Sequence, residues 1–271
     1  MGYTVKDFVE SKHFPGLKLI NQLGINREIM GARIIAVADM ETYITTGALL
    51  LTSLCVYDGL DEQTVLYHLE ELSKKEISGF VVKRREETLQ QKKLFELFMQ
   101  FCDTHSIPVL ELPQTISYWA VVKYILYQAC DMVIAKYIYS KMVHDEINNF
   151  LADQRHDKPS KERFFKSLET IVGNPISLYD ENFRCIYPFT GQKEFTILKD
   201  TEKYVPHIIT KHEYIRQKRE YVEYIQKINI INNCHYYLVI TEVNEPLNEL
   251  DFITLDNTIT ALFYLLTQDV T

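Results

Sequence analysis

Polar side chains that could hold a small ligand follow an apolar run in the first sixth of the chain. Asp39 comes directly after this run, and four small or hydroxyl residues follow it closely: Thr42, Thr45, Thr46 and Gly47. One carboxylate, three hydroxyls and exposed backbone amides suit a small polar ligand. The alternative is structural, because an aspartate often caps a turn and a glycine supplies a backbone angle that other residues avoid.

Two further hydroxyl residues, Thr52 and Ser53, end the next apolar run. In open α/β sheets, ligands bind in the crevice beyond the carboxyl ends of the strands. If the two apolar runs are neighbouring strands, we expect Thr52 and Ser53 to face the same crevice as Asp39. The structural alternative, a polar turn without a ligand, applies to them as well.

Aromatic residues form a third candidate site in the second half of the chain. Ligand pockets are lined largely by apolar and aromatic side chains, so this group is a candidate pocket wall. Packing in a protein core is the alternative. The group consists of Tyr179, Phe183, Tyr187, Phe189, Tyr236 and Tyr237.

Sequence motifs of catalysis and cofactor binding are missing. There is no Gly-x-Ser-x-Gly, no phosphate-binding loop and no Gly-x-Gly-x-x-Gly. His207 and His212 do not have the four-residue spacing of a helical zinc pair, and the five cysteines form no Cys-x-x-Cys motif. We therefore expect no enzyme activity, no metal and no cofactor, and cysteines that are reduced packing residues.

The charged residues argue against direct binding to nucleic acid. The chain has a net charge of -8 at pH 7, whereas binding to phosphates needs clustered Lys and Arg. The basic runs Lys83 to Arg85 and Arg216 to Arg219 are each followed by glutamate, which is typical of solvated surface. Any contact with DNA is therefore expected to come from elsewhere than this chain.

Length and composition indicate a globular protein of two domains. The chain has 271 residues, of which 46% are hydrophobic and 24% are charged. No apolar run approaches the ~18 residues that span a bilayer, and the first residues lack a signal-peptide pattern. A cytoplasmic location without membrane contact is the expectation.

Residues 1–115 alternate short apolar runs with amphipathic stretches, which predicts an α/β domain with a mostly parallel sheet. Thr4 is the expected N-cap of a short opening helix that ends at Glu10. Helices over Glu62 to Lys74 and Gln90 to His105 should cover the sheet. The predicted strands are Leu17 to Ile20, Ile34 to Ala38, Ala48 to Ser53, Gly79 to Val82 and Pro108 to Leu112.

Residues 116–152 contain neither proline nor glycine, and their apolar residues recur mainly at steps of three and four. This pattern predicts one long linker helix with a seam that packs on a second subunit in a homodimer. Packing on its own domain alone is the alternative. The expected interface residues are Val122, Leu126, Ala129, Val133, Tyr137 and Ile147.

Residues 153–271 predict a second, α+β domain. Asp153 to Ser160 is a polar boundary, and a helix over Lys161 to Val172 follows it. Two antiparallel hairpins, an irregular helical insertion between them and a closing helix complete a unit that resembles small sensor domains of the GAF or PAS kind. The hairpin strands are Ile176 to Tyr179 with Arg184 to Tyr187, and Val222 to Ile230 with Cys234 to Val243; the turns are Asp180 to Asn182 and Asn232 to Asn233; the closing helix is Leu247 to Thr267.

Several short motifs in the first domain stand in the order of the PucR (purine catabolism regulator) family. That family's pattern has a Gly-Ile/Leu-x-Arg turn, a strand ending in Asp, a Gly-x-Leu-Leu-Leu-Thr strand, an Ala/Ser-Gly strand and an Ile-Pro strand. Here they are Gly24 to Arg27, Ile34 to Asp39, Gly47 to Thr52, Ser78 to Val81 and Ile107 to Pro113, with Tyr43 and Ile44 as the short hydrophobic turn. The first domain, from about Val5 to Tyr127, therefore resembles the amino-terminal domain of this family.

The resemblance implies a bacterial transcription regulator in which a sensor-like middle region and a carboxyl-terminal helix-turn-helix follow this domain. It also implies a fold like the amino-terminal domains of Mur ligases and HPr kinase. The family's name suggests a purine-derived effector. Two positions depart from the family's pattern, Ala48 in place of glutamate and the residues around Asp39, so no particular effector is implied.

Together these observations predict the effector-binding and dimerisation part of a PucR-type regulator. Two alternatives remain: an oligomerisation module without a ligand, and an enzyme with an unrecognised site. A buried, charge-coupled pair, such as Asp39 with His68 or Lys74, would favour the enzyme.

Overall fold

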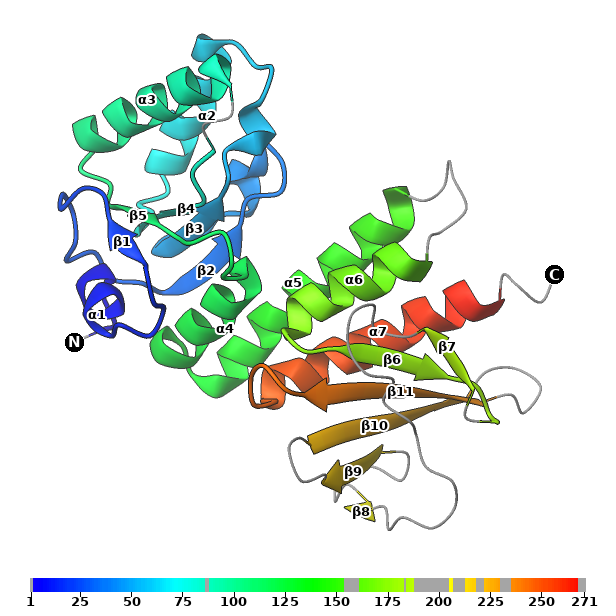
Figure 1. Ribbon diagram of the computed structural model, residues 1–271. Helices are drawn as coiled ribbons and strands as arrows, with labels where there is room; N and C mark the ends of the chain where they lie inside the picture. The colour runs from blue at the N-terminus through cyan, green and yellow to red at the C-terminus, as the bar shows by residue number, and fades with distance from the viewer. Residues whose placement is uncertain are drawn as a thin grey trace. The chain divides into compact units, whose positions relative to one another are not determined.

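The computed structural model describes residues 2–85, 88–153, 161–182, 184–187, 205–206, 213–217, 222–229 and 235–267. The chain divides into two compact units, Met1–Ala135 and Lys136–Thr271. Each unit is built around its own sheet, as Figure 1 shows. Within the described ranges, no helix has the length and apolar character needed to cross a membrane.

The first unit contains a five-stranded sheet in the order β1-β5-β4-β3-β2. Strands β2, β3, β4 and β5 run parallel to one another. Strand β1, at one edge, is antiparallel to its neighbour β5. The prediction of a mostly parallel sheet is therefore confirmed. The strands are β1 (Lys18–Leu19), β2 (Gly31–Ile34), β3 (Ala48–Thr52), β4 (Gly79–Val82) and β5 (Val109–Glu111).

Side-chain caps fix where the helices of this unit begin. Thr4 and Asp7 form a capping box at the start of α1 (Val5–Glu10), as the sequence predicted. Asp61 caps α2 (Glu62–Ser73), and Thr88 caps α3 (Leu89–Thr104). Two short 3-10 helices, η1 (Met40–Tyr43) and η2 (Cys55–Tyr57), follow β2 and β3.

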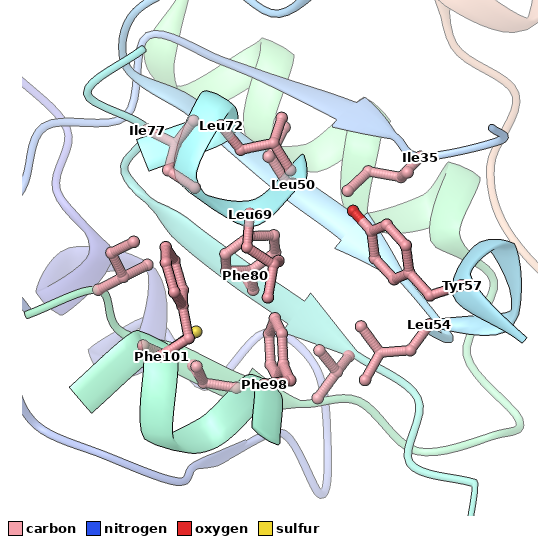
Figure 2. Close-up of a cluster of buried hydrophobic side chains, with 14 of the residues drawn as sticks. Ile35, Leu50, Leu54, Tyr57, Leu69, Leu72, Ile77, Phe80, Phe98 and Phe101 are labelled. Atoms are coloured by element: carbon pink, nitrogen blue, oxygen red, sulfur yellow. The ribbon is translucent and has the colours of Figure 1, made fainter. Parts of the chain in front are cut away.

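Helices α2 and α3 cover one face of the sheet with an apolar core (Figure 2). Leu50 and Phe80 from the strands meet Leu69 from α2 and Phe98 from α3, and each is at most 1% exposed. Burial of this apolar area is the main stabilising contribution to the unit. Helix α4 (Tyr118–Ala129) packs against β2.

Strand β2 begins and ends earlier in the chain than the strand predicted from the apolar run Ile34 to Ala38. Its residues Gly31 to Ile34 pair with Ala48 to Leu51 of β3, and the Ile35 amide still donates to the Leu51 carbonyl. Beyond Ile35 the short β3 offers no further partner. Ala36 and Val37, which follow the end of this pairing, are exposed although they are apolar.

The predicted single helix over residues 116–152 is wrong, because the chain breaks at Cys130 and Asp131. Cys130 has an extended backbone (φ -118°, ψ 151°), and the Asp131 carboxylate accepts a hydrogen bond from the Val133 amide at 2.9 Å. Asp131 thereby caps a new helix, α5 (Met132–Asp153). No glycine or proline marks this break in the sequence.

The second unit contains a six-stranded antiparallel sheet in the order β7-β6-β11-β10-β9-β8. The strands are β6 (Ile176–Tyr179), β7 (Cys185–Tyr187), β8 (Val205–Pro206), β9 (Glu213–Gln217), β10 (Val222–Asn229) and β11 (His235–Glu242). Both predicted hairpins are confirmed as antiparallel pairs. Asp180 makes the first turn by accepting the amides of Asn182 and Arg184.

The part of α5 from Lys136 onward, α6 (Lys161–Val172) and α7 (Glu249–Thr267) complete the second unit. Phe165 of α6 stacks on Tyr187, and Phe252 of α7 packs on Tyr224 of the sheet. Tyr139 of α5 hydrogen-bonds Thr254 of α7 at 3.1 Å. These contacts make the unit an α+β domain, as predicted.

The predicted helical insertion between the hairpins lies largely outside the described residues. The two parts of it that are described, β8 and β9, are strands and not helices. The predicted turn at Asn232 to Asn233 and most of the boundary Asp153 to Ser160 also lie outside them.

Candidate functional site

The motif residues of the first unit have mainly a structural role at the amino-terminal edge of its sheet. Gly24 has φ +71°, and a Cβ there would lie 2.3 Å from the Ser106 carbonyl oxygen. The Arg27 guanidinium donates to the Ile77 carbonyl at 2.6 Å and to the His105 carbonyl at 3.1 Å. The motif therefore fixes the loops at this edge.

The first predicted site is divided between two edges of the sheet. Asp39 follows the carboxyl end of β2, is exposed, and makes no side-chain cap to η1. Gly47 precedes the amino end of β3, where its carbonyl accepts the Met30 amide at 2.8 Å and the Ser78 hydroxyl at 3.1 Å. Thr42, Thr45 and Thr46 are exposed. The structure therefore does not bring Asp39 and Gly47 to one crevice.

Gly47 has φ +72° and a buried position against the Met30 side chain, which an added Cβ would approach to 2.7 Å. Both features require glycine for backbone reasons. The structural alternative for Gly47 is thus the observed one.

Thr52 and Ser53 lie at the carboxyl edge, as predicted. The Thr52 hydroxyl is buried and accepts the Leu54 amide at 2.9 Å, so it shapes the turn. Leu54 has φ +61°, an uncommon angle for a bulky residue, and such angles often occur at binding sites. Ser53 is half-buried, with its hydroxyl 3.1 Å from the Cys55 sulfur.

A groove of about 350 Å³ opens beside this turn, between the segment after β3 and the start of α3. Its size is within the range of small-molecule sites. Apolar side chains form much of its wall, and three carboxylates, an amide and an ammonium group accompany them. The lining residues are Tyr57, Asp58, Leu60, Asp61, Glu62, Val65, Gln90, Lys93, Leu94 and Leu97.

A small hollow of about 10 Å³, room for one water molecule, adjoins the groove and shares Asp58 and Leu94 with it. The basic turn Lys83 to Arg85 lines this hollow together with Ser53. Sequence reasoning assigned this turn to solvated surface. The feature that could have identified this turn as part of a site is its position at the carboxyl end of a parallel strand.

Lys83 anchors the basic turn on the opposite face of the sheet. Its ammonium group donates to the Gln114 carbonyl at 3.2 Å and lies 4.8 Å from the centre of the Tyr118 ring. Its amide donates to the Tyr118 hydroxyl at 3.1 Å. Burial lowers the pKa of Lys83 and raises the pKa of Tyr118. The backbone at the start of the turn is therefore held in place.

Glu41, Tyr57 and His68 bring three polar side chains into the core behind the groove. Glu41 and His68 approach to 3.4 Å, and burial together with the nearby Glu41 raises the pKa of Tyr57. Within the described part of the chain, Glu41 Oε2, Tyr57 Oη and His68 Nδ1 have no hydrogen-bond partner. These residues come from η1, η2 and α2, so the cluster joins the elements around the carboxyl edge.

The two pairs named as examples that would favour an enzyme, Asp39 with His68 and Asp39 with Lys74, are not observed. His68 approaches Glu41, and Lys74 pairs with Glu71 of its own helix. Asp39 remains exposed. Among the residues that the structure describes, no three His, Cys, Asp or Glu side chains are grouped to hold a metal ion.

The aromatic candidates of the second unit do not share one pocket wall. Tyr179 is buried opposite Tyr237 in the β6 and β11 pair. Tyr236 precedes Tyr237 on the same strand and therefore points to the opposite face. Tyr187 stacks on Phe165 at 4.3 Å. Phe183 and Phe189 lie outside the described residues.

The six predicted interface residues have different exposures. Val122 and Leu126 are fully buried within the first unit, and Ile147 is buried within the second. Ala129 is half-buried. Val133 and Tyr137 are 75% and 72% exposed. The packing prediction for the cysteines holds only in part, since Cys102 is buried whereas Cys55 and Cys185 are exposed.

The first unit thus combines an open, mostly parallel α/β sheet with a groove of charged and apolar side chains near the carboxyl ends of its strands. Residues 7–128 match the Purine catabolism regulatory protein-like family, PucR. The first unit is therefore a PucR-type regulator domain, as the sequence motifs predicted. No curated protein matches the chain.

Proposed function

We propose that this chain is the signal-sensing part of a PucR-type transcriptional regulator and that the carboxyl-edge groove binds its effector. The observation that carries the proposal is the groove of about 350 Å³, with its apolar wall and charged rim, in a domain of this regulator family. Its position beyond the carboxyl ends of parallel strands is the usual one for ligands of such sheets. The proposal contains no catalytic step.

The effector acts by population shift in this proposal. A ligand that binds one arrangement of the loops around η1, η2 and α2 better than another stabilises that arrangement. The buried cluster of Glu41, Tyr57 and His68 joins these same elements. A change in this cluster is one route by which effector binding in the groove alters the rest of the domain.

A thermal-shift screen of the full chain tests the proposal. The printed family name makes purine-breakdown products the first pool, followed by pools of other small metabolites. At least one pool is expected to raise the Tm, because a ligand at about 100 times its Kd stabilises by about 2.7 kcal/mol.

Two tryptophan variants locate the binding. Gln90→Trp places a large side chain at the rim of the groove and should abolish the shift. Gln63→Trp makes the same change at an exposed position that does not line the groove, and should preserve it. The absence of a stabilising pool, or a shift that survives Gln90→Trp, would contradict the proposal.

We also propose that the chain forms a homodimer through α5. Three large apolar side chains are exposed on one side of this helix, at 75% for Val133, 54% for Ile134 and 72% for Tyr137. Exposed apolar patches often mark protein interaction sites. The second unit is, in this proposal, a GAF- or PAS-like sensor domain that links the PucR-type domain to DNA-binding elements elsewhere.

Sedimentation equilibrium of the full chain tests the dimer. The natural sequence is expected at twice the monomer mass, and Val133→Glu with Tyr137→Glu at the monomer mass. Val243→Glu, at another exposed apolar position, is the matched control and should remain dimeric. A monomeric natural chain would exclude this part of the proposal.

A further inference from the structure

The basic turn at the carboxyl end of β4 contrasts with the rest of this acidic chain. The whole sequence has a net charge of -8, yet the small hollow is lined by two arginines, Arg84 and Arg85, and one carboxylate, Asp58. Lys83 also lines the hollow, but its ammonium group is bound at the Gln114 carbonyl and the Tyr118 ring. Among the described residues, the hollow thus brings two guanidinium groups beside the proposed effector groove. Such a concentration of one sign in a recess attracts ligands of the opposite sign.

The two arginines are held by the structure in different ways. The Arg84 guanidinium lies over the Phe95 ring at 4.6 Å, and its backbone carbonyl accepts the Gln114 side-chain amide at 3.0 Å. A cation over a ring face leaves its N–H groups directed sideways in the guanidinium plane. Arg84 is therefore positioned before any ligand arrives.

Arg85 already binds one carboxylate. Its Nη1 lies 3.0 Å from Oδ2 of Asp58, and both side chains are partly exposed, at 30% and 40%. Asp58 is also one of the two residues shared by the hollow and the groove. The Asp58 carboxylate therefore occupies, within the protein, the position that the acid group of a ligand could take beside Arg85.

We propose that the hollow recognises an oxyanion, a carboxylate or a phosphate, of the effector whose remaining part occupies the groove. The inference rests on the proposed function of the groove and adds the chemical class of the ligand. Because the hollow has room for only one water molecule, the oxyanion displaces Asp58 from Arg85 at the mouth of the hollow. Arg84 and the Ser53 hydroxyl supply the neighbouring hydrogen-bond donors, since a guanidinium binds an oxyanion through two parallel N–H groups.

Nuclear magnetic resonance of the full chain labelled with ¹⁵N at arginine tests the proposal. The probes are inorganic phosphate, sodium succinate and neutral succinamide, with the ionic strength held constant by sodium chloride. The Nε resonances of Arg84 and Arg85 are expected to shift saturably with phosphate or succinate and not with succinamide. Which of the two acids binds more tightly identifies the class of oxyanion.

Substitutions should change the affinity for the oxyanion in both directions. Arg84→Gln, and separately Arg85→Gln, should each weaken it by about tenfold, the loss of one charge-assisted contact. Asp58→Asn removes the competing carboxylate and should strengthen binding by about threefold. Circular dichroism confirms that each variant folds, and Ser53→Ala supplies a milder change if an arginine variant does not.

Arg163 is the matched control, because its guanidinium also lies over a ring, that of Phe150 at 5.9 Å, but in the second unit. Arg163→Gln should leave the affinity unchanged. Shifts that do not saturate, that appear equally at Arg163, or that survive both arginine substitutions would overturn the proposal.

The outcomes separate this inference from the proposed function. An effector found in the thermal-shift screen that binds equally well to Arg84→Gln and Arg85→Gln would leave the sensing function standing and overturn the oxyanion. Saturable oxyanion binding with no stabilising metabolite pool would overturn the sensing function and leave the oxyanion site standing.

Discussion

At the scale of single residues, Arg27 shows that a family motif can be explained by structure alone. Its guanidinium satisfies two backbone carbonyls from different loops, those of Ile77 and His105. We expect Arg27→Gln to lower the free energy of unfolding of the first unit by about 3 kcal/mol, since two hydrogen bonds to a charged group are lost. Urea unfolding followed by the fluorescence of Trp119, the sole tryptophan, measures this unit.

Lys6→Gln is the control for Arg27, because the ion pair of Lys6 with Glu10, at 3.9 Å, is exposed. That change should cost less than about 0.5 kcal/mol. Equal effects of the two substitutions would contradict the structural role assigned to Arg27.

Glu169 makes the stability of the second unit depend on pH. Burial raises the pKa of its carboxyl to about 7, although Oε1 accepts the Ile176 amide at 3.1 Å. The folded state therefore holds the proton more tightly than the unfolded state, so the contribution of Glu169 to stability is full below about pH 4.5 and is lost as the pH rises to about 7. Glu169→Gln keeps the acceptor and should remove this fall, stabilising the unit at pH 8 by up to about 3 kcal/mol.

Urea unfolding at pH 5.5 and pH 8.0, followed by circular dichroism, measures the effect, with Trp119 fluorescence reporting the first unit separately. Glu162→Gln, on the exposed side of the same helix, is the control and should keep the natural pH profile. A Glu169→Gln chain that still loses stability between these two pH values would show that another group is responsible.

At the scale of elements, Glu76 follows the end of α2 with φ +52°, an angle that favours glycine. Its side chain is exposed, and its backbone carbonyl accepts the Gly47 amide at 3.2 Å, which a substitution retains. We expect Glu76→Gly to stabilise the first unit by about 0.5 to 1 kcal/mol. Gln63→Gly, within the same helix, should destabilise it by about 1 kcal/mol, and Trp119 fluorescence in urea distinguishes the two. Loss of stability in Glu76→Gly would contradict the backbone assignment.

Element types were largely predictable from the sequence, whereas two boundaries were not. The apolar run Ile34 to Ala38 predicts a strand, but a strand also needs a neighbouring strand to pair with. The residues of β3 that pair with β2 end at Leu51. The break before α5 has no glycine or proline. It depends on the Asp131 side chain capping Val133, a local hydrogen bond that competes with continuation of the helix.

The candidate site was harder to predict, because residues close in sequence need not be close in a sheet. Asp39 and Gly47 are separated by a segment that returns from the carboxyl end of β2 to the amino end of β3, so they lie at opposite edges. Ser53 was placed at the correct edge, since it directly follows its strand. Arg84 and Arg85 were assigned to solvent because a mixed charge run does not show which pocket it borders.

At the scale of the whole molecule, the sequence predicted two domains, and the structure contains two compact units. The division falls between Ala135 and Lys136, inside the linker expected over residues 116–152. The first part of that expected linker, α4, packs on β2 of the first sheet. Its residues Val122 and Leu126 are buried there. The exposed residues Val133 and Tyr137 of α5 remain the candidates for contact with a second subunit.

Hydrogen–deuterium exchange of the full chain, with and without the metabolite pool that raises the Tm, shows where the effector binds. Binding in the carboxyl-edge groove predicts slower exchange in the peptides that cover residues 53–65 and 82–97. Gln90→Trp should abolish this protection, and Gln63→Trp should preserve it. Protection confined to the second unit, for example to β6 and β11, with no change in those two segments, would contradict the assignment of effector sensing to the PucR-type domain.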